Sequence, residues 1–307
     1  MSKKTLLPTL VLAVLLLGLT YAFTRYRISE MSPVSPITSG FTPKESLSNK
    51  IKNALEPKSA LQKLLDQSVK EKEGTYGIYV KNLIDSKGAA INTERQFQSA
   101  SLYKLWLMAA AYQMQKDGKL PPDEELAANK FDLYQRLSLD TDEKLKEENL
   151  SYTVKNAIEQ MIIVSDNDAA YLLTARVGIS EVDSFLKKYQ FNNSNIAQPP
   201  VTTAKDIASF FEKLYGGEII DRQNSDKMLE LLKRQRLNDR IPKNLPENVK
   251  VAHKTGELDT FKHDAGIVFG EKPYILVILT DTKNPPEAVG WMANFSKQLF
   301  DYFESVK

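Results

Sequence analysis

The sequence predicts an α+β fold, in which a β-sheet formed by both ends of the chain carries an inserted all-helical region. Strand patterns occur early, at residues 75–83, and again near the C-terminus, at residues 249–254, 265–269 and 274–281. Between them, residues 101–215 show mainly helical spacing of apolar residues. Because strands at both ends enclose a helical middle, a sheet domain with a helical insertion is the architecture that fits.

The first predicted elements are a helix and a β-hairpin. Residues 57–70 carry apolar side chains at helical spacing, namely Leu61, Leu64, Leu65 and Val69. Residues 75–83 then alternate between apolar and polar side chains as a strand does, and a polar turn at 85–88 indicates that residues 89–93 return as its partner.

The middle of the chain is predicted to contain one fully buried helix and two amphipathic ones. Residues 102–114 are apolar nearly all round, which indicates a central helix, whereas 153–164 and 180–189 each have one apolar face. After the C-terminal strands, residues 286–303 close the chain as a helix.

The N-terminal region, residues 1–27, is predicted to be a signal anchor. Residues 5–23 contain no charge, follow Lys3 and Lys4, and as a helix would span roughly 28 Å, close to the hydrocarbon thickness of a bilayer. We therefore expect a single-pass membrane protein whose remainder lies outside the cytoplasm. The small residues around Thr20 and Ala22 leave open a cleaved signal peptide and a secreted protein.

Residues 28–48 are predicted to be an extended linker, because they are rich in Ser, Thr and Pro and contain Pro33, Pro36 and Pro43. The rest of the chain, residues 49–307, contains no internal repeat and is predicted to form one enzyme-sized domain.

Composition excludes several function classes. Among 307 residues, 41 Lys and Arg stand against 39 Asp and Glu, and a net charge of +2 gives no case for binding nucleic acid. The absence of cysteine excludes disulfides, thiolate metal sites and cysteine nucleophiles, and two histidines cannot form a three-histidine metal site. The patterns HExxH, GxSxG, GxGxxG and GxxxxGK[ST] are all missing. No cofactor is therefore predicted.

Three short motifs carry the candidate chemistry, in the order Ser101-Leu102-Tyr103-Lys104, Ser165-Asp166-Asn167 and Lys254-Thr255-Gly256. An SxxK pattern alone is weak, since average composition predicts roughly one in a chain of this length. A second copy runs from Ser184 to Lys187 in an amphipathic segment, where a solvated helix face is the simpler interpretation. All three motifs in this order are expected by chance in well under about 1% of such chains.

With these motifs the sequence resembles the penicillin-recognising serine enzymes, the superfamily of class A β-lactamases and penicillin-binding proteins. The resemblance covers roughly residues 61–303 and is strongest to class A, because classes C and D have other residues at the SDN position. It implies a β-lactamase/transpeptidase-like fold, with an antiparallel sheet flanked by terminal helices. It also implies an acyl-enzyme formed with a β-lactam or a peptidoglycan-type peptide.

The residues themselves explain why Ser101 and Lys104 form a reactive pair. A serine hydroxyl needs a base to take its proton, and a lysine three residues later lies one helical turn away on the same face. In an apolar helix, burial and the neighbouring charge of Lys254 favour the neutral form of Lys104. The alternative, a lysine that extends to the surface, fits the apolar flanks of this segment less well.

The resemblance assigns roles to the other two motifs. Ser165 would relay a proton to the leaving nitrogen, and Asn167 would hold the substrate amide. An ordinary helix cap is the structural alternative for this motif. Lys254 and Thr255 would bind a substrate carboxylate, and Gly256 would let the acyl group approach the strand.

The resemblance also places an oxyanion hole at the backbone N–H groups of Ser101 and Glu257. His263 falls near an arginine of class A enzymes that helps bind the substrate carboxylate, so His263 or Lys262 is expected to supply that function. A structural role is the simpler interpretation of His253, and it is also the alternative for His263.

One departure from class A bears on the activity. Those enzymes carry ExxLN between SDN and KTG, and its glutamate activates the water that hydrolyses the acyl-enzyme. No ExxLN occurs here, and Glu181 precedes the region within a helix. The sequence therefore favours a penicillin-binding enzyme of DD-peptidase type. A β-lactamase with another route to activate water and a catalytically idle cell-wall binding domain remain the alternatives. The oligomeric state is not predicted.

Overall fold

A computed structural model describes residues 58–305 of the chain. Its centre is a five-stranded antiparallel sheet in the order β2-β1-β9-β8-β7. The strands are β1 (Thr75–Asn82), β2 (Gly88–Ile91), β7 (Lys250–Leu258), β8 (Phe261–Phe269) and β9 (Tyr274–Asp281). The first strand thus pairs with the last, and β7, which carries the KTG motif, lies at an edge of the sheet.

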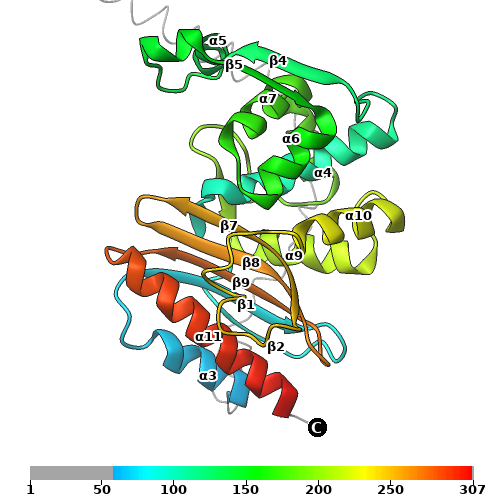
Figure 1. The fold of residues 1–307 in the computed structure, drawn as a ribbon. Helices are drawn as coiled ribbons and strands as arrows, with labels where there is room; N and C mark the ends of the chain where they lie inside the picture. Colours follow the sequence, from blue (N-terminus) through cyan, green and yellow to red (C-terminus); the bar gives the residue numbers. More distant parts are fainter. Residues whose placement is uncertain (1–57, 306–307) are drawn as a thin grey trace, which may run out of the picture. The chain divides into compact units, whose positions relative to one another are not determined.

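Two helices from opposite ends of the described chain, α3 (Ala60–Val69) and α11 (Pro285–Ser305), cover one face of the sheet (Figure 1). The indole N–H of Trp291 donates a hydrogen bond of 2.8 Å to the carbonyl of Ser68 and joins the two helices. Trp291 also meets the ring of Tyr76 edge-on, so the helix layer and β1 share one apolar core.

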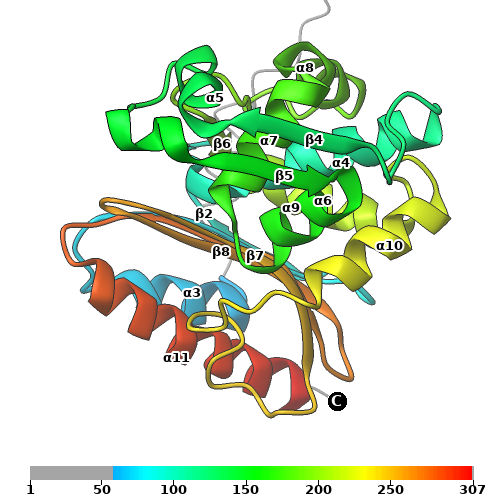
Figure 2. The same cartoon turned by 45° about the horizontal axis from the view of Figure 1, so that its top comes forward.

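The other face of the sheet carries the helical region (Figure 2). Its helices are α4 (Tyr103–Lys116), α5 (Lys130–Arg136), α6 (Val154–Ile163), α7 (Asn167–Val177), α8 (Ile179–Lys188), α9 (Ala204–Gly216) and α10 (Arg222–Leu232), with the 3-10 turns η1 (Ala100–Leu102) and η2 (Glu143–Glu147). The helix α4 is buried in the centre, where Trp106 packs against Phe191 and Phe210. The predicted α+β fold with a helical insertion is confirmed.

The helical region also contains two small two-stranded antiparallel sheets, which the prediction of a mostly helical middle did not include. Strand β3 (Gln96–Gln98) pairs with β6 (Val201–Thr203), and β4 (Glu125–Asn129) pairs with β5 (Asn149–Thr153). The sequence of β4, ELAAN, contains no β-branched residue and favours a helix on propensity alone. Tertiary pairing decides its conformation.

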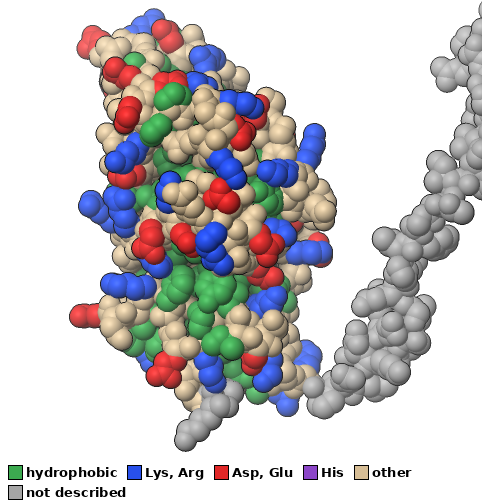
Figure 3. Space-filling view, turned by 90° about the vertical axis from the view of Figure 1, so that its right-hand side faces the viewer, with side chains coloured by type: hydrophobic (Ala, Val, Ile, Leu, Met, Phe, Trp, Pro, Cys, Tyr) green, Lys and Arg blue, Asp and Glu red, His purple; other side chains and the backbone are tan. Residues whose placement is uncertain are grey.

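Charged side chains of both signs are intermingled over the face shown in Figure 3, as the small net charge leads one to expect. Within residues 58–305, no helix has the length and apolar character needed to cross a membrane. The predicted signal anchor (residues 1–27) and the linker (28–48) lie outside the described residues.

Candidate active site

Ser101 lies in the 3-10 turn η1, directly before the buried helix α4, and it is partly exposed. The preceding Ala100 has φ +43°, a left-handed conformation that costs a residue with a side chain about 1–2 kcal/mol. Neighbouring hydrogen bonds hold this backbone: the N–H of Ser99 donates to the carbonyl of Pro200 (2.8 Å), and that of Leu102 to the carbonyl of Ser99 (2.9 Å). Ser101 is therefore presented on a fixed turn.

Lys104 follows one turn later and is fully buried in α4. Its Nζ donates hydrogen bonds to the carbonyl of Ser165 (2.6 Å), to Oδ1 of Asn167 (2.7 Å) and to Oγ of Ser165 (3.3 Å). Burial lowers the pKa of Lys104 to about 7, against an opposing effect of the Asp166 carboxylate. The neutral amine that a general base requires is thus accessible near neutral pH.

Ser165 stands at the junction between α6 and α7, with φ +61°. The next residue, Asp166, caps α7 by accepting a hydrogen bond of 2.7 Å from the N–H of Ala169. The cap interpretation of the SDN motif therefore holds for Asp166, whereas the Ser165 hydroxyl faces two lysines. The hydrogen bonds of Lys104 run to this motif, and the described structure has none between Lys104 and Ser101.

Lys254 reaches Ser165 from the sheet side. It is fully buried in β7, and its Nζ donates to Oγ of Ser165 and to the carbonyl of Thr255, both at 2.8 Å. Burial, and next the charge of Lys104, hold the pKa of Lys254 well below its ordinary value. Because two ammonium groups this close repel each other, the arrangement favours a state in which at most one of the two lysines is protonated.

Gly256 lets the edge strand β7 lie directly against η1. A Cβ at this position would lie 3.0 Å from the carbonyl oxygen of Ser99, 3.1 Å from the ring of His263 and 3.2 Å from the side chain of Leu102. Strand β7 therefore contacts η1, the turn that carries Ser101, and Glu257 follows Gly256 in this strand.

The two histidines are structural. His263 is fully buried: its Nδ1 accepts a hydrogen bond from the N–H of Thr280 (3.1 Å), so its Nε2 donates to the carbonyl of Gln98 (2.8 Å). Burial lowers the pKa of His263 to about 4. With both ring nitrogens engaged and no charge, His263 is not presented to a substrate carboxylate, contrary to the expectation from sequence.

His253 is likewise buried. Its Nδ1 pairs with Oδ1 of Asp264 at 2.8 Å, and its Nε2 with Oδ1 of Asn238 at 3.0 Å. The other carboxylate oxygen of Asp264 accepts the N–H of Ile241 (3.0 Å). His253 and Asp264 therefore fasten the segment between α10 and β7 to the sheet.

That segment also delivers Arg240, which was not predicted from the sequence. Arg240 donates from Nη1 to the carbonyl of His263 (3.1 Å) and from Nη2 to Oε2 of Glu257 (2.5 Å). Lys262, the other residue predicted for an anion-binding role, pairs with Oε1 of Glu257. An arginine in an irregular segment carries no pattern of burial or periodicity, so no sequence signal could have found it.

The loop between α8 and β6, residues 189–200, contains no Asp, Glu or His. The buried Asp206 fastens it: one of its carboxylate oxygens accepts the N–H of Asn193 (2.9 Å) and the hydroxyl of Ser194 (2.8 Å). The loop thus lacks the ExxLN glutamate, as predicted, and it contains no other carboxylate or imidazole side chain that could serve as a base.

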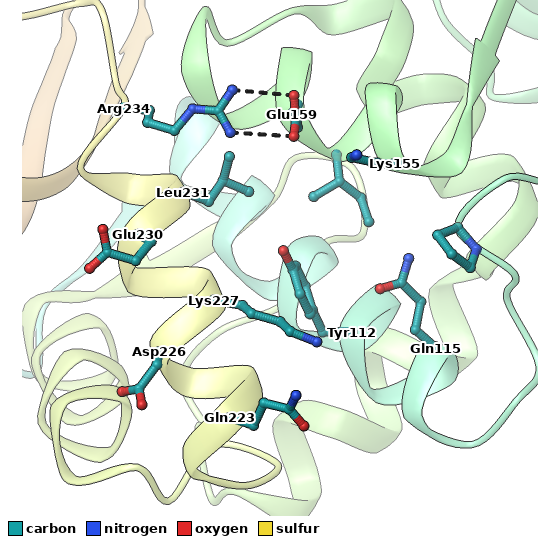
Figure 4. Close-up of a pocket in the computed structure, with 12 residues that line it drawn as sticks. Tyr112, Gln115, Lys155, Glu159, Gln223, Asp226, Lys227, Glu230, Leu231 and Arg234 are labelled. Atoms are coloured by element: carbon teal, nitrogen blue, oxygen red, sulfur yellow. Dashed lines mark hydrogen bonds and ion pairs between the residues drawn. The ribbon is translucent and has the colours of Figure 1, made fainter.

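A separate hollow of about 650 Å³ lies over α4, α6 and α10, and Figure 4 shows its lining. Its charged groups are of both signs, and Arg234 pairs with Glu159 at 3.3 Å. None of the motif residues lines it.

Comparison with known proteins fits this geometry. Residues 56–303 match the family model described as the beta-lactamase enzyme family. The chain belongs to this family. It is a serine acyl-transfer hydrolase of the beta-lactamase family, with the β-lactamase/transpeptidase-like fold that the motifs led us to expect.

Solved structures share the fold of this beta-lactamase family member. PBP-A has a TM-score of 0.73 and 23% identity, over 82% of this chain and 98% of that one. The β-lactamase of Sphaerobacter thermophilus DSM 20745 has a TM-score of 0.70 and 19% identity, over 80% and 98%. The TLA-3 extended-spectrum β-lactamase has 0.69 and 22%, over 79% and 98%. The sequence matches none of the curated proteins with which it was compared.

Proposed function

We propose that this protein is a penicillin-binding enzyme of DD-peptidase type, which forms a long-lived acyl-enzyme at Ser101. Its acyl donors would be peptides that end in a D-Ala-D-Ala-type carboxylate, with β-lactams as mimics. One observation carries the proposal: Lys104 and Lys254, from two of the motifs, both donate hydrogen bonds to the hydroxyl of Ser165 in the third. The loop 189–200, in contrast, contains no carboxylate or imidazole that could act as a base for hydrolysis.

In the acylation step, the Oγ of Ser101 attacks the carbonyl carbon while its proton passes to neutral Lys104. The oxyanion that develops accepts hydrogen bonds from the N–H groups of Ser101 and Glu257. The carbon–nitrogen bond then breaks, and the leaving nitrogen takes a proton through the hydroxyl of Ser165, which Lys104 and Lys254 contact from either side.

Substrate positioning is proposed for three further groups. The Asn167 amide would bind the acyl-side amide of the substrate, although its Oδ1 also fixes Lys104. Thr255 and Lys254 would meet the substrate carboxylate at the edge of β7. Gly256 keeps the strand free of a side chain where the acyl group lies.

Among the solved structures, a mutant of PBP-A forms an acyl-enzyme complex with penicillin G, and its TM-score to this chain is 0.71 at 23% identity. This supports a penicillin-reactive serine in the present fold. The β-lactamase alternative draws support from Lys104, because an amine with a pKa of about 7 can also activate water.

A fluorescent penicillin tests the proposed function. Stoichiometric labelling that persists for hours, with little turnover of nitrocefin, is the expected result. Transient labelling with sustained nitrocefin hydrolysis would establish a β-lactamase, and intact protein that takes no label would establish an idle binding domain.

We further propose that residues 5–23 anchor the enzyme in the cell membrane with residues 49–307 on its outer side. The proposal rests on the charge-free run and its basic flanks. The mature protein should fractionate with membranes and be released by a protease that cuts within residues 28–48. A soluble mature form beginning near Phe23 would instead identify a cleaved signal peptide.

A further inference from the structure

The segment 235–238, which follows α10, is fastened to the C-terminal end of α6. The side chain of Gln235 is buried: its Nε2 donates a hydrogen bond of 2.7 Å to the carbonyl of Ile162, and its Oε1 accepts the N–H of Arg236 at 2.9 Å. The same N–H also donates to the carbonyl of Ile163 (2.9 Å). Because the last carbonyl groups of a helix have no partner within it, this segment supplies partners for the end of α6.

That end of α6 leads directly into the turn that carries Ser165. Ile163 is the last residue of α6, and Ser165 follows two positions later with φ +61°. A left-handed conformation is costly for a residue with a side chain, so the surrounding structure has to hold it. The hydrogen bonds of Gln235 and Arg236 act on the backbone immediately before this turn.

The other end of the segment reaches β7. Oδ1 of Asn238 lies 3.0 Å from Nε2 of His253, which directly precedes Lys254. The segment 235–238 therefore contacts both the helix that leads to Ser165 and the strand that carries Lys254, and these two side chains meet at 2.8 Å. Within the part of the chain that the structure describes, the hydrogen bonds of the segment run to neighbours of the two side chains and not to the side chains themselves.

We propose that Gln235 and Asn238 are positioning residues for acylation: by holding the end of α6 against β7, they keep the hydroxyl of Ser165 within hydrogen-bond distance of Lys254. The inference rests on the proposed function. In that reaction the leaving nitrogen takes the proton of the Ser165 hydroxyl as the carbon–nitrogen bond breaks, and Ser165 recovers a proton from Lys104, which was protonated during the attack. A misplacement of about 1 Å can slow such a step about 100-fold.

Two acyl donors separate this effect from a general loss of structure. Benzylpenicillin leaves through a nitrogen, which has to be protonated. In an N-acylated D-alanyl thioester of thioglycolate, the carbon–sulfur bond breaks and the sulfur leaves with the electron pair as a thiolate, so no proton is needed. Acylation by penicillin is followed by mass spectrometry, and acylation by the thioester is followed through the released thiol. The chain contains no cysteine, so a thiol reagent detects only that product.

Gln235→Met keeps a side chain of similar length but removes its hydrogen bonds, and Asn238→Ala removes an exposed amide without leaving a cavity. Each variant should slow acylation by benzylpenicillin about tenfold and change the rate with the thioester by less than about twofold. Ser225→Ala is the matched control. It removes a buried hydroxyl that donates to the carbonyl of Ile219 (2.8 Å) near the other end of α10, and it should change neither rate.

A double-mutant cycle with Ser165→Ala is the second measurement. Because the segment is proposed to act through Ser165, Gln235→Met and Asn238→Ala should have no further effect on the residual penicillin acylation of Ser165→Ala. Losses that multiply in the cycle, or equal losses with both donors, would refute the positioning role. If Gln235→Met does not fold, the same comparisons with Asn238→Ala decide. Failure of either donor to acylate wild-type Ser101 would instead refute the proposed function.

Discussion

Lys254 donates a hydrogen bond of 2.8 Å to Oγ of Ser165, 89 positions earlier in the chain. This contact joins the edge of the sheet to the helical region. Lys104, in α4, donates to the same hydroxyl oxygen, with its Nζ 3.3 Å from the Oγ of Ser165. The candidate site therefore exists only where the two parts of the domain meet, and its chemistry depends on two lysines that share one hydroxyl.

The first prediction identifies the nucleophile. Ser101→Ala should abolish covalent labelling by penicillin, because Ser101 is the serine of the η1 turn, which directly precedes the helix that carries Lys104. The matched control is Ser184→Ala, in the second SxxK sequence. Ser184 donates to the carbonyl of Ser180 within α8, and its loss should leave labelling intact. An adduct located by mass spectrometry on a peptide without Ser101 would contradict the assignment.

The second prediction concerns pH. The pKa of Lys104 is lowered to about 7, so the neutral amine forms as the pH rises through that value. The rate of acylation should therefore increase with pH, with a midpoint near 7, and level off above it.

Lys104→Arg keeps a charge that does not dissociate, and it should lose acylation by at least about 100-fold, the contribution of a general base. Lys187→Arg, at the lysine of the second SxxK sequence, should leave the profile unchanged. A flat profile between pH 5 and 9 in the wild type would show that Lys104 is not the base.

The third prediction concerns release of the acyl group. Because the loop 189–200 offers no carboxylate or imidazole, hydrolysis should lack the 10²- to 10⁴-fold contribution that a positioned base typically makes. Nitrocefin should give a burst of about one equivalent followed by slow turnover, measured by stopped-flow absorbance. Rapid steady hydrolysis that disappears in Ser101→Ala would instead point to water activation by Lys104.

The fourth prediction tests the close packing at Gly256. A methyl group there would press on the carbonyl of Ser99 and on Leu102, and would shift the turn that holds Ser101. Gly256→Ala should slow acylation about tenfold or more while the protein stays folded. The control is Gly290→Ala in α11, where nothing lies within 4 Å of the new Cβ; it should leave acylation unchanged and raise stability by up to about 1 kcal/mol.

The fifth prediction concerns stability. Asp264 is fully buried and accepts hydrogen bonds from His253 and from the N–H of Ile241. Asp264→Ala leaves these donors without a partner, and it should lower the free energy of unfolding by about 3 kcal/mol in urea denaturation. Asp226→Ala, whose carboxylate is 56% exposed in a surface pair with Arg222, should cost less than about 1 kcal/mol.

Much of the fold was predictable because the decisive elements have strong local patterns. The all-round apolar run predicted at 102–114 is the buried helix α4, and the strands near the C-terminus lie where expected, although β8 begins earlier, at Phe261. The pairing of β4 with β5 was not predictable, since residues such as Leu126 and Ala127 have no strand pattern.

The site was predictable as far as it rests on motifs. Hydrogen bonds join Lys104 and Lys254 to Ser165, and Ser101 lies in the turn directly before the helix of Lys104. The environment of His263 and Arg240 was not accessible from sequence, because burial of a polar side chain depends on partners far away in the chain, such as the carbonyl of Gln98 for His263. The ion pairs of Glu257 with Arg240 and Lys262 could not be predicted for the same reason.

The pairing of β1 with β9 also governs how the protein is made. Thr75 is opposite Asp281, so the central sheet joins residues separated by most of the folded chain. High contact order of this kind slows folding, and the sheet cannot close before the last strand has been synthesised. Ser101 is made early, but Lys254, which donates to Ser165, is made only with β7. A nascent or C-terminally truncated chain therefore has the nucleophile without the catalytic centre, and reactivity toward penicillin reports on completed folding.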